Sequence, residues 1–135
     1  METLESRWVP STLTVLNTHD SGTGSLRAVI AAAHHGDTIN FAQGLDGQTI
    51  TLTSGELLVK QDITIVGPSD RGVTISGDNE WRVFELSSKT KPQVTLSGLT
   101  ISDGYAPGPF GYSSNNGGGI YNEAGILTVS NCNLS

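Results

Sequence analysis

The chain has 135 residues, the length of one domain, and a formal net charge of −6. This negative balance argues against a surface that binds the phosphates of a nucleic acid. Charged residues make up 15% of the chain while Gly occurs 17 times, which is typical of a β-rich protein with many turns and not of a helical bundle. No apolar run reaches about 18 residues, so the sequence predicts no transmembrane segment.

Residues 1–10 mix both charges without an apolar stretch, so they do not form a signal peptide as written. We interpret them as a leader remnant or disordered segment. Residues 11–41 predict an N-terminal cap made of a strand at 11–15, a turn-rich segment at 17–24 and an α-helix at about 25–35.

The predicted helix has one apolar stripe with the spacing i, i+3, i+4 and i+7. The stripe consists of Leu26, Val29, Ile30 and Ala33. Ser25 or Thr23 is suited to accept hydrogen bonds from its first amides, and Gly36 is suited to end it.

Two adjacent histidines, His34 and His35, are expected in the last turn of this helix, where the negative helix end favours them. Neighbouring helical residues point about 100° apart, so the pair does not predict a metal site. The single cysteine, Cys132, has no disulfide partner within the chain and is interpreted as a buried apolar residue or as a link between chains. The sequence predicts no metal centre and no cofactor.

After Gly36 the hydrophobic period changes to two and stays there. Short alternating segments, separated by Gly, Asn, Asp or Ser, predict an all-β region. Residues 72–77 (GVTISG) match residues 93–98 (QVTLSG) 21 positions later, and residues 94–102 match residues 127–135 at 33 positions. A second phrase at 63–65 recurs at 84–86, again 21 positions later.

A period in the low twenties with two or three short strands per repeat predicts a solenoid, with the longer interval explained by a loop at 104–116. Aliphatic residues at equivalent positions are then expected to stack in interior columns. The expected columns are Leu52, Ile75, Leu96 and Val129 in one, and Ile65 with Leu86 in another.

The stretch at 115–123 (NNGGGIYNE) contains a Gly triplet. No helix follows it, which argues against a phosphate-binding loop. We interpret the triplet as a corner that closes the long loop and leads into a strand at 120–122.

These segments resemble the right-handed parallel β-helix proteins of the pectin-lyase-like superfamily, and within it the bacterial cell-surface and extracellular repeat proteins. Residues 13–41 are similar to their capping segment, residues 48–68 to their first rungs, and residues 94–104 with 117–135 to their recurrent rung. Residues 117–120 (GGGI) are similar to the GGAI-type repeat of polymorphic outer membrane proteins.

The resemblance implies an all-β, right-handed parallel β-helix solenoid of about 4–5 short coils at 42–135, with the capping α-helix at about 25–35. It also implies a secreted or cell-surface location. The leading functional interpretation is a non-catalytic module with a structural, adhesive or carbohydrate-binding role, taken from a longer bacterial protein. The alternative is the N-terminal part of a polysaccharide lyase or glycoside hydrolase whose catalytic rungs lie beyond this chain.

Lyases of this superfamily bind Ca²⁺ through carboxylates on neighbouring rungs. At a spacing of 21, Asp78 is expected beside Leu99 and Asp103 beside Arg82, so no carboxylate ladder is predicted. Glu85 is expected to point outward with Thr64 as its neighbour, and it therefore lacks the second carboxylate of a glycosidase. We predict no catalytic residue, which leaves enzymatic activity open with the balance against it.

Aromatic side chains are the best candidates for ligand binding. Tyr105, Phe110 and Tyr112 lie in the long loop, and Trp81 precedes it. Rings on the face of a solenoid stack on sugars or hold a protein, so a glycan or a surface protein is the expected partner, and packing of the loop is the other interpretation.

The last residues form a complete repeat phrase, and only the N-terminal side has a predicted cap. A bare last coil presents unpaired backbone groups and an apolar cross-section. Two explanations stay open: the chain is a fragment of a longer β-helix, or it associates end to end through the uncapped C-terminal coil.

Overall fold

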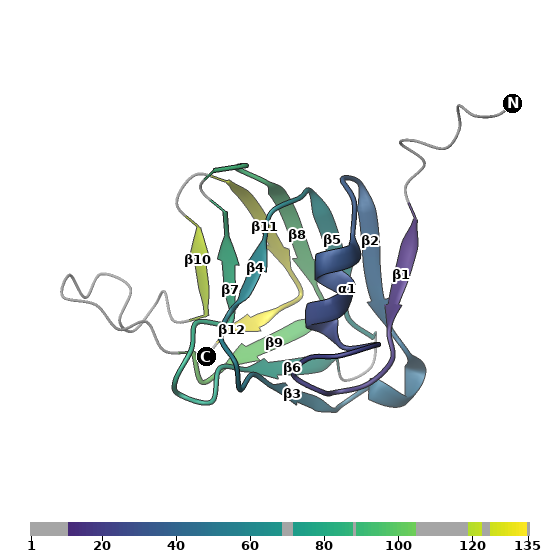
Figure 1. The fold of residues 1–135 in the computed structure, drawn as a ribbon. Helices are drawn as coiled ribbons and strands as arrows, with labels where there is room; N and C mark the ends of the chain where they lie inside the picture. The colour runs from purple at the N-terminus through teal and green to yellow at the C-terminus, as the bar shows by residue number, and fades with distance from the viewer. Residues whose placement is uncertain (1–10, 69–71, 88, 105–118, 123–124, 135) are drawn as a thin grey trace, which may run out of the picture.

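The computed structural model describes residues 11–68, 72–87, 89–104, 119–122 and 125–134. Within them the chain is mostly β-structure with one α-helix, and the strands pair in parallel (Figure 1). The expected segment at 1–10 and the loop residues 105–118 lie outside this description. The elements are β1 (Thr12–Val15), α1 (Leu26–Ala32), β2 (Asp37–Phe41), the 3-10 turn η2 (Gln43–Leu45), β3 (Thr49–Thr51), β4 (Leu57–Val59), β5 (Ile63–Val66), β6 (Val73–Ser76), β7 (Phe84–Leu86), β8 (Gln93–Ser97), β9 (Leu99–Ser102), β10 (Ile120–Asn122), β11 (Ile126–Ser130) and β12 (Asn133–Leu134).

The strands form three parallel sheets. Sheet A has the order β1-β2-β5-β8-β11, sheet B the order β12-β9-β6-β3, and sheet C the order β10-β7-β4. From β2 onward the chain visits the sheets in the fixed order A, B, C. We call one such passage a circuit. Each circuit adds one strand to the same side of every sheet, so the three sheets grow together along one direction.

The register differs from the expected spacing of 21. Strand β5 pairs with β8 so that Ile65 lies beside Leu96, and β8 pairs with β11 so that Leu96 lies beside Val129. The interval of 33 is therefore correct, but Ile75 belongs to sheet B, where it lies beside Ile50 and Ile101. The first expected column was right for Leu96 with Val129 and wrong for Leu52 and Ile75, because similar phrases occur in strands of different sheets.

The second expected column was also wrong. Leu86 pairs with Val59 and Asn122 in sheet C, and not with Ile65 of sheet A. The strand predicted after the Gly triplet is present as β10, and its Ile120 lies beside Phe84.

The corner between β8 and β9 shows how the chain turns from sheet A into sheet B. Gly98 has φ +70°, and a Cβ atom on the neighbouring Gly67 would lie 2.1 Å from the Gly98 carbonyl oxygen. A side chain at Gly67 is therefore excluded by backbone, because two corners approach each other more closely than any Cβ contact allows. One circuit later Asn131 takes the same place with φ 52°, as asparagine tolerates this conformation.

Helix α1 is shorter than predicted. The Ser25 side chain accepts a hydrogen bond from Ala28 N, as expected for an N-cap, but the helix ends at Ala32. Gln61 explains the early end, because its side-chain amide donates to the carbonyl oxygens of Ile30 and Ala33. The two histidines consequently lie beyond the helix and not in its last turn. The helix is not long and apolar enough to cross a membrane, and no other α-helix occurs in the described residues.

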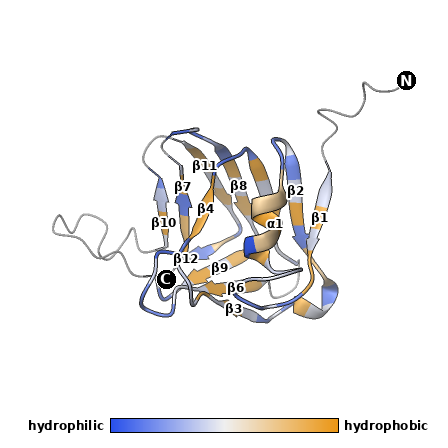
Figure 2. Cartoon of the chain, in the orientation of Figure 1, coloured by the Kyte–Doolittle hydropathy of each residue, from blue (hydrophilic) through white to orange (hydrophobic). Residues whose placement is uncertain are grey.

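The core lies between the three sheets, and α1 lies across one end of it (Figure 1). Apolar and polar residues alternate along the strands, while the connecting turns are hydrophilic (Figure 2). At the end covered by α1, the inward residues are fully covered: Leu52 and Val59 are 0% exposed. At the opposite end Val129 is 38% exposed, although its column neighbours Ile65 and Leu96 are 0% exposed.

Two matched valine substitutions test this difference between the ends. Val59→Ala removes two buried methyl-sized groups and is expected to lower the free energy of unfolding by about 2 to 3 kcal/mol. Val129→Ala is expected to cost less than about 1 kcal/mol, because this side chain already contacts water. Urea denaturation of the three proteins measures both values, and equal losses would contradict the assignment of one covered and one uncovered end.

Candidate functional site

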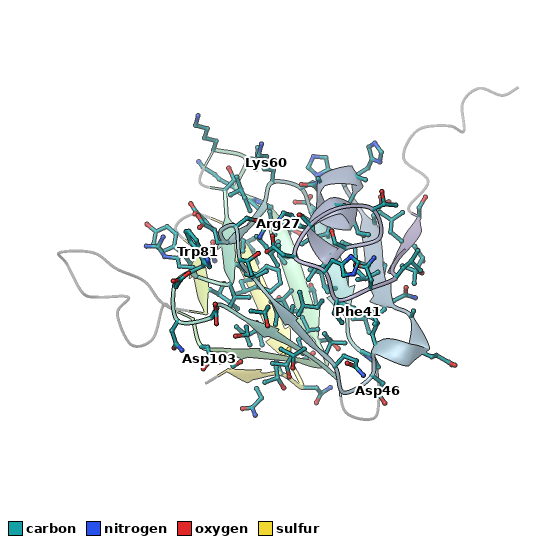
Figure 3. The ribbon with its side chains drawn as sticks, turned by 60° about the horizontal axis from the view of Figure 1, so that its bottom comes forward. Arg27, Phe41, Asp46, Lys60, Trp81 and Asp103 are labelled. Atoms are coloured by element: carbon teal, nitrogen blue, oxygen red, sulfur yellow. The ribbon has the colours of Figure 1, made fainter. Side chains whose placement is uncertain are left out.

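The predicted aromatic contact surface is described only at Trp81. Trp81 lies between β6 and β7, is half-buried and packs against the core, and its indole nitrogen Nε1 is buried without a hydrogen-bond partner. Figure 3 places Trp81 on the same side of the molecule as Asp103, away from Phe41. Tyr105, Phe110 and Tyr112 lie outside the described residues, so binding through these rings stays a prediction.

Arg82 and Tyr121 form a contact that the repeat spacing did not reveal. The guanidinium carbon of Arg82 lies 4.6 Å from the centre of the Tyr121 ring, within the range of a cation–π interaction. The pair joins the start of β7 to β10, the neighbouring strand of sheet C. Sequence reasoning missed it because the partner of β7 depends on the register.

Acidic residues meet at the corner after β6 and β9, contrary to the expected pairings of Asp78 with Leu99 and of Asp103 with Arg82. Ser76 pairs with Ser102, so the turns that follow them are neighbours. The Asn79 amide donates to the Asp103 carbonyl oxygen at 2.8 Å, and the Ser76 hydroxyl donates to Oδ2 of Asp103 at 3.3 Å. Asp78, Asn79 and Asp103 all have positive φ.

This acidic corner is therefore a hydrogen-bonded turn pair. Tight turns of this kind are ordinary positions for Asp and Asn. In the part of the chain that the structure describes, no group of three or more His, Cys, Asp or Glu side chains is placed to hold a metal ion. Glu85 has Leu58 and Tyr121 as its column neighbours and not Thr64, and neither of them is an acid.

Asp20 and Arg27 form the most extensive polar network of the described residues. Arg27 on α1 donates to a carboxylate oxygen of Asp20 at 3.0 Å and to the carbonyl oxygens of Gly55 and Glu56. The Asp20 carboxylate also accepts hydrogen bonds from the Thr53 amide and from the Ser54 hydroxyl. The network attaches both the segment before α1 and the helix itself to the turn between β3 and β4.

The pKa of Asp20 reflects this network. Partial burial raises the pKa, but the hydrogen bonds from Ser54, Thr53 and Arg27, together with the Arg27 charge, outweigh burial and lower it from 3.8 to about 2. Asp37, which is 4% exposed, has the same kind of balance. Burial raises its pKa, but hydrogen bonds from the amides of His34 and Ser11 outweigh burial, so the pKa lies below its ordinary value. Both carboxylates hold the cap in place by accepting backbone hydrogen bonds.

The two histidines, His34 and His35, form hydrogen bonds with two aspartates close to α1. The His34 amide donates to Asp37 at 2.8 Å, and the Asp62 amide donates to Nδ1 of His35 at 3.1 Å. The imidazole of His35 thus accepts a backbone hydrogen bond at the start of β5. The expectation that the pair supports a helix end was wrong, because both residues lie in the connection from α1 to β2.

At the end of the three sheets opposite α1, the described residues include edge strands that no further strand covers. These edge strands are β10, β11 and β12, one in each sheet. On β11 Ile126 is 59% and Val129 38% exposed. Cys132 is aligned with Leu99 by the pairing of β12 with β9, and it is partly exposed where Leu99 is buried. The thiol is therefore the last member of an interior column.

A groove of about 460 Å³ runs along the corner between sheets A and B. Its lining includes Gly98, Thr100, Asn131 and Cys132, which belong to two successive circuits. The described side chains that line it carry no charge, and they present hydroxyl, amide and backbone groups. Sequence reasoning missed it because the groove follows from the close approach of the corners.

No family model, no curated protein and no solved structure matches the chain.

The Asp20 network predicts a specific loss of stability in acid. The folded pKa of about 2 is lower than the ordinary value of 3.8, so the carboxylate stabilises the fold above about pH 4, and this contribution is lost as the pH falls towards 2. Asp20→Asn is expected to lower the free energy of unfolding at neutral pH, and the deficit is expected to shrink over that interval. Urea denaturation as a function of pH measures it.

Glu80→Gln is the matched control, because it removes one carboxylate from an exposed turn. It is expected to leave the neutral-pH stability close to that of the wild type. An Asp20→Asn deficit that stays constant down to pH 2 would contradict the role given to the charged carboxylate.

Proposed function

We propose that the chain is a right-handed parallel β-helix module with a structural, non-catalytic role, which holds one closed end and offers one open end for stacking. The fixed order of sheets A, B and C supports this architecture, because each circuit returns the chain to the next position of the same sheet. Crossover connections between parallel strands are right-handed in nearly all proteins, which supports the handedness.

The exposure of Val129 carries the functional part of the proposal. Val129 continues a column in which Ile39, Ile65 and Leu96 are 0% exposed, yet it is 38% exposed itself. An inward aliphatic side chain of a parallel sheet is covered only when the next strand is added. The last circuit thus has the shape of a repeat that receives another repeat.

The structural role is favoured over a catalytic one by what the acidic residues do. Asp20, Asp37 and Asp103 accept hydrogen bonds that hold the cap and a corner. Their carboxylates are engaged in folding contacts. The secreted or cell-surface setting and the adhesive or carbohydrate-binding role, which the resemblance to the pectin-lyase-like superfamily implies, remain part of this proposal.

Extending the chain by one circuit tests the proposal directly. A copy of residues 77–102 joined after residue 135 supplies a strand to each of sheets C, A and B, in the order that β12 requires. If the open end receives a circuit, the extended protein unfolds in one transition, with a higher midpoint. Its denaturant m-value is expected to rise by about a fifth, the ratio of 26 added residues to 135.

The control is the same extension with Asp in the copied positions of Val94, Leu96 and Ile101, which are buried in the original circuit. This extension is expected to remain unfolded and to leave the m-value of the transition unchanged. An unmodified extension that behaves like the control, or that unfolds in a separate transition, would refute the proposed role.

A further inference from the structure

We propose that the outer face of sheet A binds ice, with its threonine and serine side chains aligned on the water molecules of the crystal surface. This inference concerns the side of the stack and neither of its ends, so it goes beyond the proposed structural role. We call this surface the hydroxyl face. It consists of two columns of outward side chains on the strands β1, β2, β5, β8 and β11 (Figure 1).

The first column of the hydroxyl face consists of threonine alone. The pairing of sheet A aligns Thr64 with Thr38 on one side and with Thr95 on the other. The same register continues to both outermost strands, and the complete column is Thr12, Thr38, Thr64, Thr95 and Thr128. Each of the five strands thus contributes one threonine at the same position of the register, and none of these residues is buried.

The second column lies two residues further along each strand and therefore on the same side of the sheet. Thr14 lies beside Asn40, and Ser97 lies between Val66 and Ser130. None of these residues is buried. The Thr14 hydroxyl donates to Oδ1 of Asn40 at 2.8 Å, which orients the first two side chains of the column. Hydroxyl groups therefore repeat both along and across the strands of sheet A.

The stack itself does not require a uniform outward column. In sheet C the corresponding outward column consists of Leu58, Glu85 and Tyr121, which are an aliphatic residue, an acid and an aromatic residue. Strand propensity favours threonine, but it favours valine and the aromatic residues as well. It accounts for a threonine at one position and not for the repetition of threonine on every strand of sheet A.

Sheet B has a shorter threonine column, but its second column takes part in the fold. Thr74 lies between Thr49 and Thr100. Two residues further along the strand, Ser76 is only 7% exposed, and its hydroxyl donates to the Asp103 carboxylate. Sheet B therefore does not present two exposed columns, and sheet A does.

The spacing of the hydroxyl face indicates the partner that it fits. Neighbouring strands lie about 4.8 Å apart, and alternate residues of a parallel strand lie about 6.6 Å apart. The oxygen atoms on the prism face of hexagonal ice repeat along two perpendicular directions at similar distances. Water molecules that are hydrogen-bonded to the hydroxyl groups take over this spacing. Threonine is branched at Cβ and restricted in χ1, so the array loses little conformational freedom when it binds.

The residue types of the hydroxyl face argue against other partners. Contacts between proteins depend mostly on Trp, Tyr and Arg, while Ser, Thr and Val contribute little. Sugars are held by stacking on aromatic rings, and nucleic acids by Lys and Arg. The two columns contain none of the residue types on which these three partners depend. A partner that is recognised by the spacing of hydroxyl groups is the one that remains.

Thermal hysteresis, the difference between the melting and growth temperatures of an ice crystal, tests the proposal on the full chain. The wild-type protein is expected to hold the growth temperature below the melting temperature and to change the shape of the crystal. The double substitution Thr64→Tyr with Thr95→Tyr is expected to abolish both effects, because two rings then project above the hydroxyl groups. Its stability in urea is expected to stay close to that of the wild type, since tyrosine is favoured in strands.

Two further substitutions by tyrosine are the matched controls. Thr23 is exposed in the turn before α1 and lies outside the sheets, and Thr74 lies on sheet B. Thr23→Tyr and Thr74→Tyr are both expected to retain the hysteresis of the wild type.

A gain of activity separates the proposal from any effect of misfolding. Val66 is 36% exposed and is the member of the second column that has no polar side-chain atom. Val66→Thr supplies a hydroxyl group at this position and is expected to increase the hysteresis at equal protein concentration.

Each other outcome overturns the proposal. A wild-type protein without hysteresis does not bind ice, and the extension by one circuit then still tests the structural role separately, because it concerns the end of the stack. A loss caused by Thr74→Tyr and not by the double substitution places the ice-binding surface on sheet B. An equal loss in Thr23→Tyr, or a decrease in Val66→Thr, shows that the hydroxyl face is not the surface that contacts ice.

Discussion

Every circuit of this molecule depends on the next one to cover its inward aliphatic side chains. Ile39, Ile65 and Leu96 are completely buried because each has a strand on both sides in sheet A. A strand pairs with its neighbours through backbone hydrogen bonds, and the same pairing brings the inward side chains into contact. Contacts between neighbouring circuits therefore provide much of the stability. At the two ends of the stack, where a neighbouring circuit is absent on one side, other groups have to cover the inward side chains and pair with the backbone.

The closed end replaces the missing circuit with a helix and with side chains that bond to the backbone. Helix α1 supplies Leu26 and Ile30 to the core, while Arg27 and Gln61 satisfy carbonyl and amide groups beside β4. Asp20 holds Arg27 in position, and its low pKa shows how strongly its neighbours favour the charged carboxylate. A polar network thus performs at this end the task that strand pairing performs everywhere else.

Sequence reasoning correctly identified the β-rich character, one α-helix with Ser25 as one of two candidate N-caps, and the interval of 33 between β8 and β11. It failed for the interval of 21, because Val73 of sheet B and Val94 of sheet A lie in nearly identical phrases. Alternation with a period of two is the same in every sheet, so it cannot assign a strand to one of them. The assignment is made by corners such as the one at Gly67 and Gly98, whose close approach is a property of three-dimensional packing.

The corrected register also changes which residues are candidates for function. It brings Asp78 and Asp103 into neighbouring turns, where their hydrogen bonds account for them, and it puts Val129 and Cys132 at the ends of two interior columns. A polar residue that is engaged in the fold requires no ligand to explain it. An interior residue that is exposed to water marks a position where burial of further apolar surface would stabilise the protein. Among the described residues, the end opposite α1 is for this reason a stronger candidate for a contact surface than any of the polar clusters.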